Sequence, residues 1–183
     1  MHVMEPKRVG MDRIVNAAAA AGMGYPPPLV VVDLGTATTF SVLDPEGAFI
    51  GGAICPGVNT SLKALSKAAA QLPDIFLQDP AGAFEKDPDP SSQIKLPVVA
   101  GNTEGCMRSG SLYGNACLIE GMVARMEAEL GYPLRVILTG GHASLIHPHL
   151  KCAAVRVEEL LMQGLYFIYK QIADQTDRGV ETP

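Results

Sequence analysis

Short apolar runs rich in β-branched residues alternate along the chain with longer segments whose apolar positions recur every three or four residues. The first run, 29–32, is followed by two more at 40–43 and 48–50. Between these two lies Asp44-Pro45-Glu46-Gly47, which has the composition of a tight turn. We therefore predict antiparallel strands joined by turns over residues 29–54, and one further buried strand at 135–138.

Helical spacing predicts four main helices. They are a helix at 12–22, a helix capped by Asn59, Thr60 or Ser61, a long helix from Asn102 or Thr103 to about Leu130, and a helix at 156–173. Residues 73–101 are rich in proline and aspartate and are predicted to form a surface excursion. The alternation of strands and helices places the chain in the α/β class.

The long helix carries four glycines, at positions 105, 110, 114 and 121. Each costs roughly 1 kcal/mol relative to alanine in a helix interior. Close approach of another helix would explain them, either within the chain or across a dimer interface.

The composition narrows the choice of partners. The formal net charge is −5, with no basic cluster, which argues against nucleic acid or an anionic membrane as a main partner. No apolar run approaches the roughly 20 residues that span a bilayer. The cysteines at 55, 106, 117 and 152 lack metal-site spacing, so we expect free thiols and a cytoplasmic protein.

The segment between the first two strands is the strongest functional signal. A buried apolar run ends at Asp33, and Gly35, Thr36, Thr38 and Thr39 follow directly. Glycine permits a tight turn, and hydroxyls added to free backbone N–H groups can hold a phosphate. Because a strand rather than a helix follows, the ordinary P-loop and dinucleotide fingerprints are excluded. The pattern suggests the phosphate-binding hairpin of the actin and hexokinase fold, although a purely structural hairpin has the same features.

Several other residues could carry chemistry, each with a structural alternative. Asp33 could bind a cation or could cap the turn. Gly140 and Gly141 could lie against a flat ligand or form a tight turn after the strand at 135–138. Asp12 could orient a hydroxyl nucleophile or act as a helix cap.

Other polar positions have similar alternatives. Arg13 could hold a carboxylate or phosphate as a fork, or be solvated. Thr103 could contact a ligand or cap the long helix. His142, His147 and His149 do not form a clear metal pair, and we expect them to be exposed to solvent.

The order of these motifs is more specific than any one of them. Gly10-Met11-Asp12-Arg13 precedes the Asp33–Thr39 segment, and Gly51-Gly52-Ala53-Ile54-Cys55-Pro56-Gly57, Asn102-Thr103 and Thr139-Gly140-Gly141 follow. This series resembles the type III pantothenate kinases, the family that includes the Bvg accessory factor, from about Val9 to Tyr169. The resemblance implies the actin-like, ribonuclease H-like ATPase fold, with a mixed sheet, a phosphate-binding β-hairpin and flanking helices.

The resemblance also implies an activity and its ligands. Members phosphorylate pantothenate with ATP in the first step towards coenzyme A, using Mg²⁺ and a monovalent cation, K⁺ or NH₄⁺. They are homodimers, here expected to pair through helix 103–130. By position, Asp12 would be the catalytic base and Asp33 the cation ligand. Gly10, Met11, Arg13 and Thr103 would line the pantothenate site, Thr103 from the partner subunit. Gly35, Thr36, Thr38, Gly140 and Gly141 would bind ATP.

Two departures from the family pattern stand out. Met11 replaces the usual alanine of the Gly-x-Asp-Arg motif and could crowd the substrate. The family's first phosphate loop is also missing, which predicts three regions: residues 1–24 as a remnant of a first actin-like domain, 25–173 as a second domain, and 174–183 as a disordered tail. Half a cleft supplies half of the electrostatic stabilisation, so we expect weak or no turnover from this chain alone.

Two alternatives to a pantothenate kinase remain at this point. One is a non-catalytic nucleotide-binding or ligand-binding regulatory protein of the same fold. The other is a different actin-like kinase that acts on a sugar or an acid. The Gly10–Arg13 motif and Asn102-Thr103 favour pantothenate over this last substrate class.

Overall fold

The fold is built on one five-stranded mixed sheet. The computed structural model describes residues 8–77 and 96–177. The strands are β1 (Leu29–Leu34), β2 (Ala37–Leu43), β3 (Phe49–Pro56), β4 (Arg135–Thr139) and β5 (Ala154–Arg156), in the order β3-β2-β1-β4-β5. β1, β2 and β3 form an antiparallel meander, whereas β4 runs parallel to β1 and β5 parallel to β4. The predicted meander and the predicted strand at 135–138 are confirmed.

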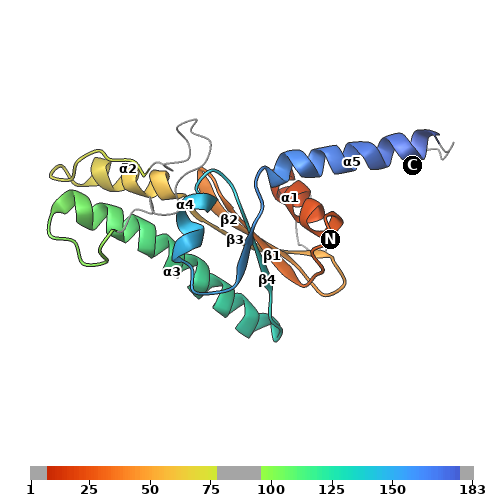
Figure 1. Ribbon diagram of the computed structural model, residues 1–183, viewed down its shortest axis with the longest axis horizontal. Helices are drawn as coiled ribbons and strands as arrows, with labels where there is room; N and C mark the ends of the chain where they lie inside the picture. The colour runs from red at the N-terminus through yellow and green to blue at the C-terminus, as the bar shows by residue number, and fades with distance from the viewer. Residues whose placement is uncertain (1–7, 78–95, 178–183) are drawn as a thin grey trace.

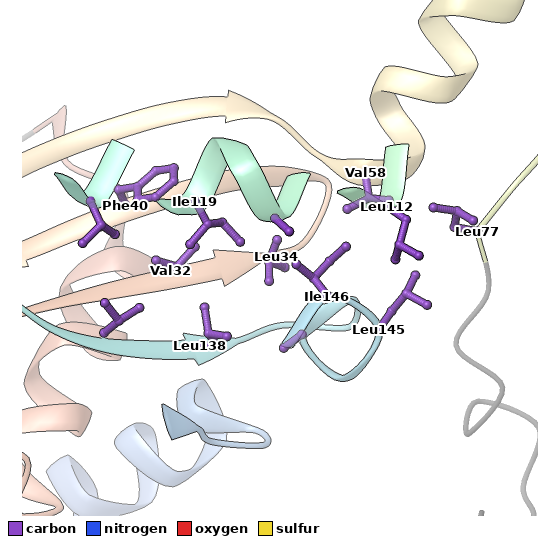
Figure 2. Packing of buried hydrophobic residues seen from close by; sticks show 14 of the residues in the cluster. Val32, Leu34, Phe40, Val58, Leu77, Leu112, Ile119, Leu138, Leu145 and Ile146 are labelled. Carbon is purple, nitrogen blue, oxygen red and sulfur yellow. The ribbon is translucent and has the colours of Figure 1, made fainter. Parts of the chain in front are cut away.

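One face of the sheet carries the larger core. Side chains alternate along a strand, so Val32 and Leu34 point to the same face as Phe40 of the paired strand β2. Helices α2 (Val58–Ala68), α3 (Thr103–Leu130) and α4 (Ala143–Ile146) cover this face, and α4 continues into a 3₁₀ turn, η4 (His147–His149). Figure 2 shows Ile119 beside Phe40 and Val32, and Leu112 beside Val58 at the start of α2.

The opposite face carries a smaller core beneath α1 (Met11–Gly22) and the start of α5 (Leu160–Asp177). Figure 1 shows these two helices side by side, on the other side of the sheet from α2, α3 and α4. They approach closely because Gly164 of α5 has no side chain. A Cβ at Gly164 would lie 2.7 Å from the Cβ of Ala19 and 3.0 Å from Val15 Cγ1. This packing fixes the position of α1, which carries the Gly10–Arg13 motif.

The ends of several elements differ from the sequence predictions. Strand β5 was not predicted, and the last helix begins at Leu160 instead of 156 because β5 occupies 154–156. That helix ends at Asp177, beyond the predicted start of the tail at 174, whereas 178–183 lie outside the described residues. Helix α2 begins at Val58, with Gly57 as its cap, so the predicted cap from Asn59, Thr60 or Ser61 was wrong.

Other helix predictions are settled by named contacts. Asn102 caps α3, since its Oδ1 accepts a hydrogen bond of 2.7 Å from the Gly105 amide. Most of the predicted excursion at 73–101 falls on residues 78–95, which are outside the described ranges. No helix in those ranges combines the length and hydropathy needed to cross a membrane.

Candidate functional site

The hairpin between β1 and β2 has its tip at Gly35-Thr36, as predicted. The Gly35 amide donates to the Ala37 carbonyl at 3.1 Å, which closes the turn. The Thr36 carbonyl accepts the Gly57 amide at 3.1 Å and the Thr60 hydroxyl at 2.7 Å. The first residues of α2 therefore brace the hairpin, and the Thr36 side chain is left exposed.

Asp33 lies at the carboxyl end of β1, on the face covered by α1. Its Oδ2 accepts a hydrogen bond of 3.0 Å from Asn16 Nδ2 of α1. Burial raises the pKa of the Asp33 carboxyl above its ordinary value; the Asn16 hydrogen bond lowers that pKa, and the negative charge of Asp12 raises it. Asp33 is thus a carboxylate held in a partly desolvated setting, where a cation would favour its ionised form.

Gly140, which directly follows β4, lies against the same Asp33 carboxylate. Its φ is +93°, a left-handed conformation that side chains other than glycine adopt only with strain. A Cβ at this position would overlap Asp33 Oδ1 and would lie 2.6 Å from the Leu34 amide nitrogen. At Gly141, by contrast, a Cβ would meet nothing within 4 Å in the structure. Gly140 is required for close packing, and Gly141 leaves open space beside it.

Asn16, Asp33 and Gly140 border one cavity of about 430 Å³, a size that suits a small ligand; Gly35 and Thr36 at the hairpin tip are not part of its lining. Its lining includes Asn16, Asp33, Thr139, Gly140 and Gly141, together with residues from β5 to the start of α5. The cavity lies where the strand order departs from the chain order, beside the carboxyl ends of β1 and β4. Open α/β sheets bind ligands at such positions.

Asp12 and Arg13 lie in the first turn of α1 and point to different surroundings. Asp12 is exposed, and its carboxylate accepts no hydrogen bond from the described residues. Arg13 instead donates from Nη2 to the Phe40 carbonyl at 2.9 Å and from Nε to Ser41 Oγ at 3.2 Å. Burial lowers the pKa of Arg13, an effect that Asp12 opposes. Arg13 therefore fastens α1 to β2.

Comparison with known proteins decides the family. The family model for type III pantothenate kinase matches residues 1–125. The type III pantothenate kinase of Caulobacter vibrioides is 44% identical over 171 residues, which are 93% of this chain and 60% of that protein. The one from Dehalococcoides mccartyi strain BAV1 is 42% identical over 165 residues, 90% of this chain and 57% of its own length. This chain belongs to the type III pantothenate kinase family. It spans about 60% of the length of the curated relatives it matches.

The fold agrees with this assignment. The crystal structure of a conserved Baf family protein from Campylobacter jejuni superposes with a TM-score of 0.62 at 21% identity, covering 95% of this chain and 70% of that one. The mixed sheet, the hairpin after Asp33 and the helices on both faces confirm the expected architecture.

Within this family member, two of the predicted site residues, Thr38 and Met11, do not line the cavity. Thr38 is fully buried, and its hydroxyl has no hydrogen-bond partner in the parts of the chain that the structure describes. Alternation along β2 puts Thr38 on the face opposite Asp33, while Thr39 pairs with Asp33 and shares its face. Met11 is 70% exposed, so its side chain does not fill the interior beside α1.

Thr103 is remote from the other predicted site residues. It is exposed at the start of α3, and Figure 1 shows that end of α3 beside α2, at the opposite end of the molecule from α1. Within one chain, Thr103 and Asp12 therefore do not meet.

The histidines do not behave as predicted. His142, His147 and His149 are partly buried and not solvent-exposed. His142 Nε2 lies 2.8 Å from Asn59 Nδ2, His147 Nε2 lies 3.1 Å from the Ala154 carbonyl, and the His149 ring meets Tyr113 edge-on. No group of three metal-ligating side chains occurs among the described residues.

Sequence reasoning missed two residues of the cavity. Asn16 stands four positions after Asp12, on the same side of α1, which was an available signal. Thr139 pairs with Asp33 across β1 and β4 and is 4% exposed. The sequence shows Thr139 directly before the two glycines, but it does not show that Thr139 faces Asp33, because that depends on the register of β1 and β4.

Proposed function

We propose that this chain binds ATP in the cavity beside Asp33 and takes part in the phosphorylation of pantothenate. One observation carries the proposal: Asp33, Gly140 and the helix bearing Asp12 meet at a single cavity in a member of this family. Gly35 and Thr36 at the hairpin tip, with Gly140 and Gly141 after β4, supply backbone and open space for the phosphates and the adenosine.

Asp12 is proposed as the base. It is exposed in the first turn of α1, at the open entrance to the proposed substrate position. In the proposed reaction the pantothenate hydroxyl oxygen forms a bond to the γ-phosphorus, the bond from that phosphorus to the bridging oxygen breaks, and ADP leaves. The hydroxyl proton passes to the Asp12 carboxylate. Gly10, Met11 and Arg13 are proposed to border this substrate, although Arg13 acts chiefly by holding α1 in place.

The residues present fit a hard cation. Asp33 offers carboxylate oxygens next to the cavity, and no cysteine or histidine lies in the lining. The lining also holds Glu158 and Glu159, but both are exposed and Glu158 is paired with Arg156, so Asp33 is its only partly buried carboxylate. Mg²⁺ or a monovalent cation at Asp33 would therefore need phosphate oxygens and water to complete its coordination, as is usual for nucleotide-bound ions. Bound there, a cation neutralises phosphate charge.

A homodimer through α3 is proposed to complete the site. A Cβ at Gly110, Gly114 or Gly121 would meet nothing within 4 Å, so nothing in the described parts of this chain explains these glycines. The groove between α2 and α3, of about 250 Å³, borders Gly110 and Gly114. A second copy packed on this face would account for them and could bring its Thr103 to the substrate.

Two measurements test the proposal on the chain as it stands. ATP binding is measured by calorimetry, and ADP release is coupled to pantothenate in Mg²⁺ and K⁺. Asp12→Asn should abolish the weak pantothenate-dependent release expected of this chain, whereas Asp74→Asn, at an exposed position, should leave it unchanged. ATP binding without any turnover would support the non-catalytic alternative, and no ATP binding would refute the proposal.

The dimer has a separate test by sedimentation velocity. Gly114→Arg should shift the protein to monomer, because a long charged side chain would occupy the proposed interface. Ala18→Arg, at an exposed position of α1, is the matched control and should leave the dimer intact. A wild-type monomer at micromolar concentration would contradict this part of the proposal.

A further inference from the structure

Asn16 is a buried polar residue in an otherwise apolar part of α1. It is 2% exposed, and Ala17, Ala19 and Ala20 beside it are equally buried. Its Nδ2 donates to Asp33 Oδ2 at 3.0 Å. Its Oδ1 has no hydrogen-bond partner in the described parts of the chain.

This arrangement is unfavourable for folding alone. A buried oxygen without a partner loses its bonds to water and gains nothing in return. An apolar side chain of similar size would avoid that loss while filling the same volume. What asparagine adds at this position is the bond to Asp33.

The Asp33 carboxylate is also confined on its other side. Its Oδ1 lies against Gly140, at a distance that leaves no room for a Cβ. The Asn16 amide on one oxygen and the Gly140 backbone on the other leave the carboxylate a single orientation at the end of β1. Groups that receive an ion need this kind of support from neighbouring hydrogen bonds.

We propose that Asn16 is a positioning residue, whose amide fixes the orientation of the Asp33 carboxylate and joins helix α1 to the phosphate hairpin. Because Asp12 lies one turn before Asn16, the same bond sets the distance between the proposed base and the cation-binding carboxylate. The orientation of Asp33 stands on the geometry above; its effect on cation and nucleotide binding rests on the proposed function.

The first test needs no ligand. Three-bond couplings to the Asp33 carboxyl carbon report its χ1 angle in ¹³C,¹⁵N-labelled protein, with the resonance assigned from Asp33→Asn. The wild type should show one rotamer. Asn16→Leu, which keeps the volume and removes the unpartnered oxygen, should fold and show rotamer averaging. Asn16→Ala provides a second variant without the amide.

The matched control is Val15→Ala. Val15 is 7% exposed, packs at the contact with Gly164 and lies next to Asn16 in sequence. Its truncation should loosen α1 against α5 and lower stability, yet leave Asp33 in one rotamer. A single Asp33 rotamer in Asn16→Leu would overturn the proposal, as would averaging of equal size in Val15→Ala.

The second test measures the consequence for binding. Calorimetric titration of ATP at increasing K⁺ should give a half-saturating K⁺ concentration at least tenfold higher in Asn16→Leu than in the wild type. Asn16→Gln retains the amide donor and should recover part of the change. An unchanged K⁺ requirement in Asn16→Leu would refute the link to the cation. If the wild type binds no ATP while the rotamer result holds, the proposed function fails and the positioning role stands.

Discussion

Replacing Arg13 with methionine should lower the free energy of unfolding by about 2–3 kcal/mol. The change removes a charged donor 2.9 Å from the Phe40 carbonyl, and hydrogen bonds to charged groups contribute about 1.5–3 kcal/mol. It also removes the 3.2 Å bond to Ser41 and the guanidinium 5.5 Å from the Phe49 ring centre, a contact worth about 0.5–1 kcal/mol. Desolvation of the guanidinium, seen in its lowered pKa, offsets part of this gain. Methionine keeps the apolar stem.

Urea denaturation followed by circular dichroism measures this loss. A domain of this size loses roughly 2–4 °C of Tm per kcal/mol, so the melting temperature should fall by about 4–12 °C. The stability of Arg13→Lys should lie between those of the wild type and Arg13→Met, because lysine keeps the positive charge but lacks the forked guanidinium. Arg135→Met, at an exposed arginine, is the control and should change stability by less than about 0.5 kcal/mol. Wild-type stability in Arg13→Met, combined with weaker pantothenate binding, would refute the anchoring role and favour the predicted substrate fork.

Three further changes test the site and its support. Gly140→Ala should cost about 1–3 kcal/mol from its φ of +93° and should abolish ATP binding, because the new Cβ overlaps the Asp33 carboxylate; calorimetry showing normal affinity would contradict this. Gly164→Leu should destabilise by about 1–3 kcal/mol, since its Cβ would lie 2.7 Å from that of Ala19 and force α5 away from α1; an unchanged urea midpoint would show that the helices separate freely. Asp33→Asn should stabilise the protein at neutral pH. Because the pKa of Asp33 is raised, the protonated side chain stabilises the folded state fully below the ordinary carboxyl pKa, and this contribution is lost as pH rises through the folded-state pKa. The extra stability of Asp33→Asn over the wild type should therefore vanish in acid. An equal stability difference in acid and at neutral pH would argue against titration of Asp33.

The elements predicted well are those whose signals are local. The meander over 29–54 was defined by alternating runs and turn residues, and α3 by a long helical repeat with Asn102 at its start. Strand β5 was missed because three residues at a sheet edge give no periodic signal, and only pairing with β4 makes them a strand. The histidines were misjudged because their partners, such as Asn59 and the Ala154 carbonyl, are distant in sequence or set by the fold.

The candidate site was predictable as a set of motifs, but the direction of each side chain was not. Strand alternation would have placed Thr38 and Asp33 on opposite faces of the sheet, but only with the register of β1 and β2, in which Asp33 pairs with Thr39. Asn16 directly precedes an alanine run and was not predicted as a site residue, because its role depends on a hydrogen bond to Asp33, 17 positions later in the chain. Arg13 was typical of a ligand fork in sequence, and only the approach of β2 reveals its anchoring contacts.

Asp12, in the motif at the start of α1, is exposed, and its position is fixed by contacts that other residues of the helix make. Arg13 ties the helix to β2, Asn16 ties it to Asp33, and Val15 packs it against Gly164 of α5. These three attachments leave the first turn little freedom to rotate or slide, so the orientation of Asp12 is determined by contacts that Asp12 does not make itself. A base that must meet a hydroxyl within hydrogen-bonding distance needs such support, because small displacements of a reacting group cost large factors in rate. Loss of any one attachment should consequently reduce turnover more than it reduces the affinity for ATP, because the proposed ATP site is formed mainly by the sheet.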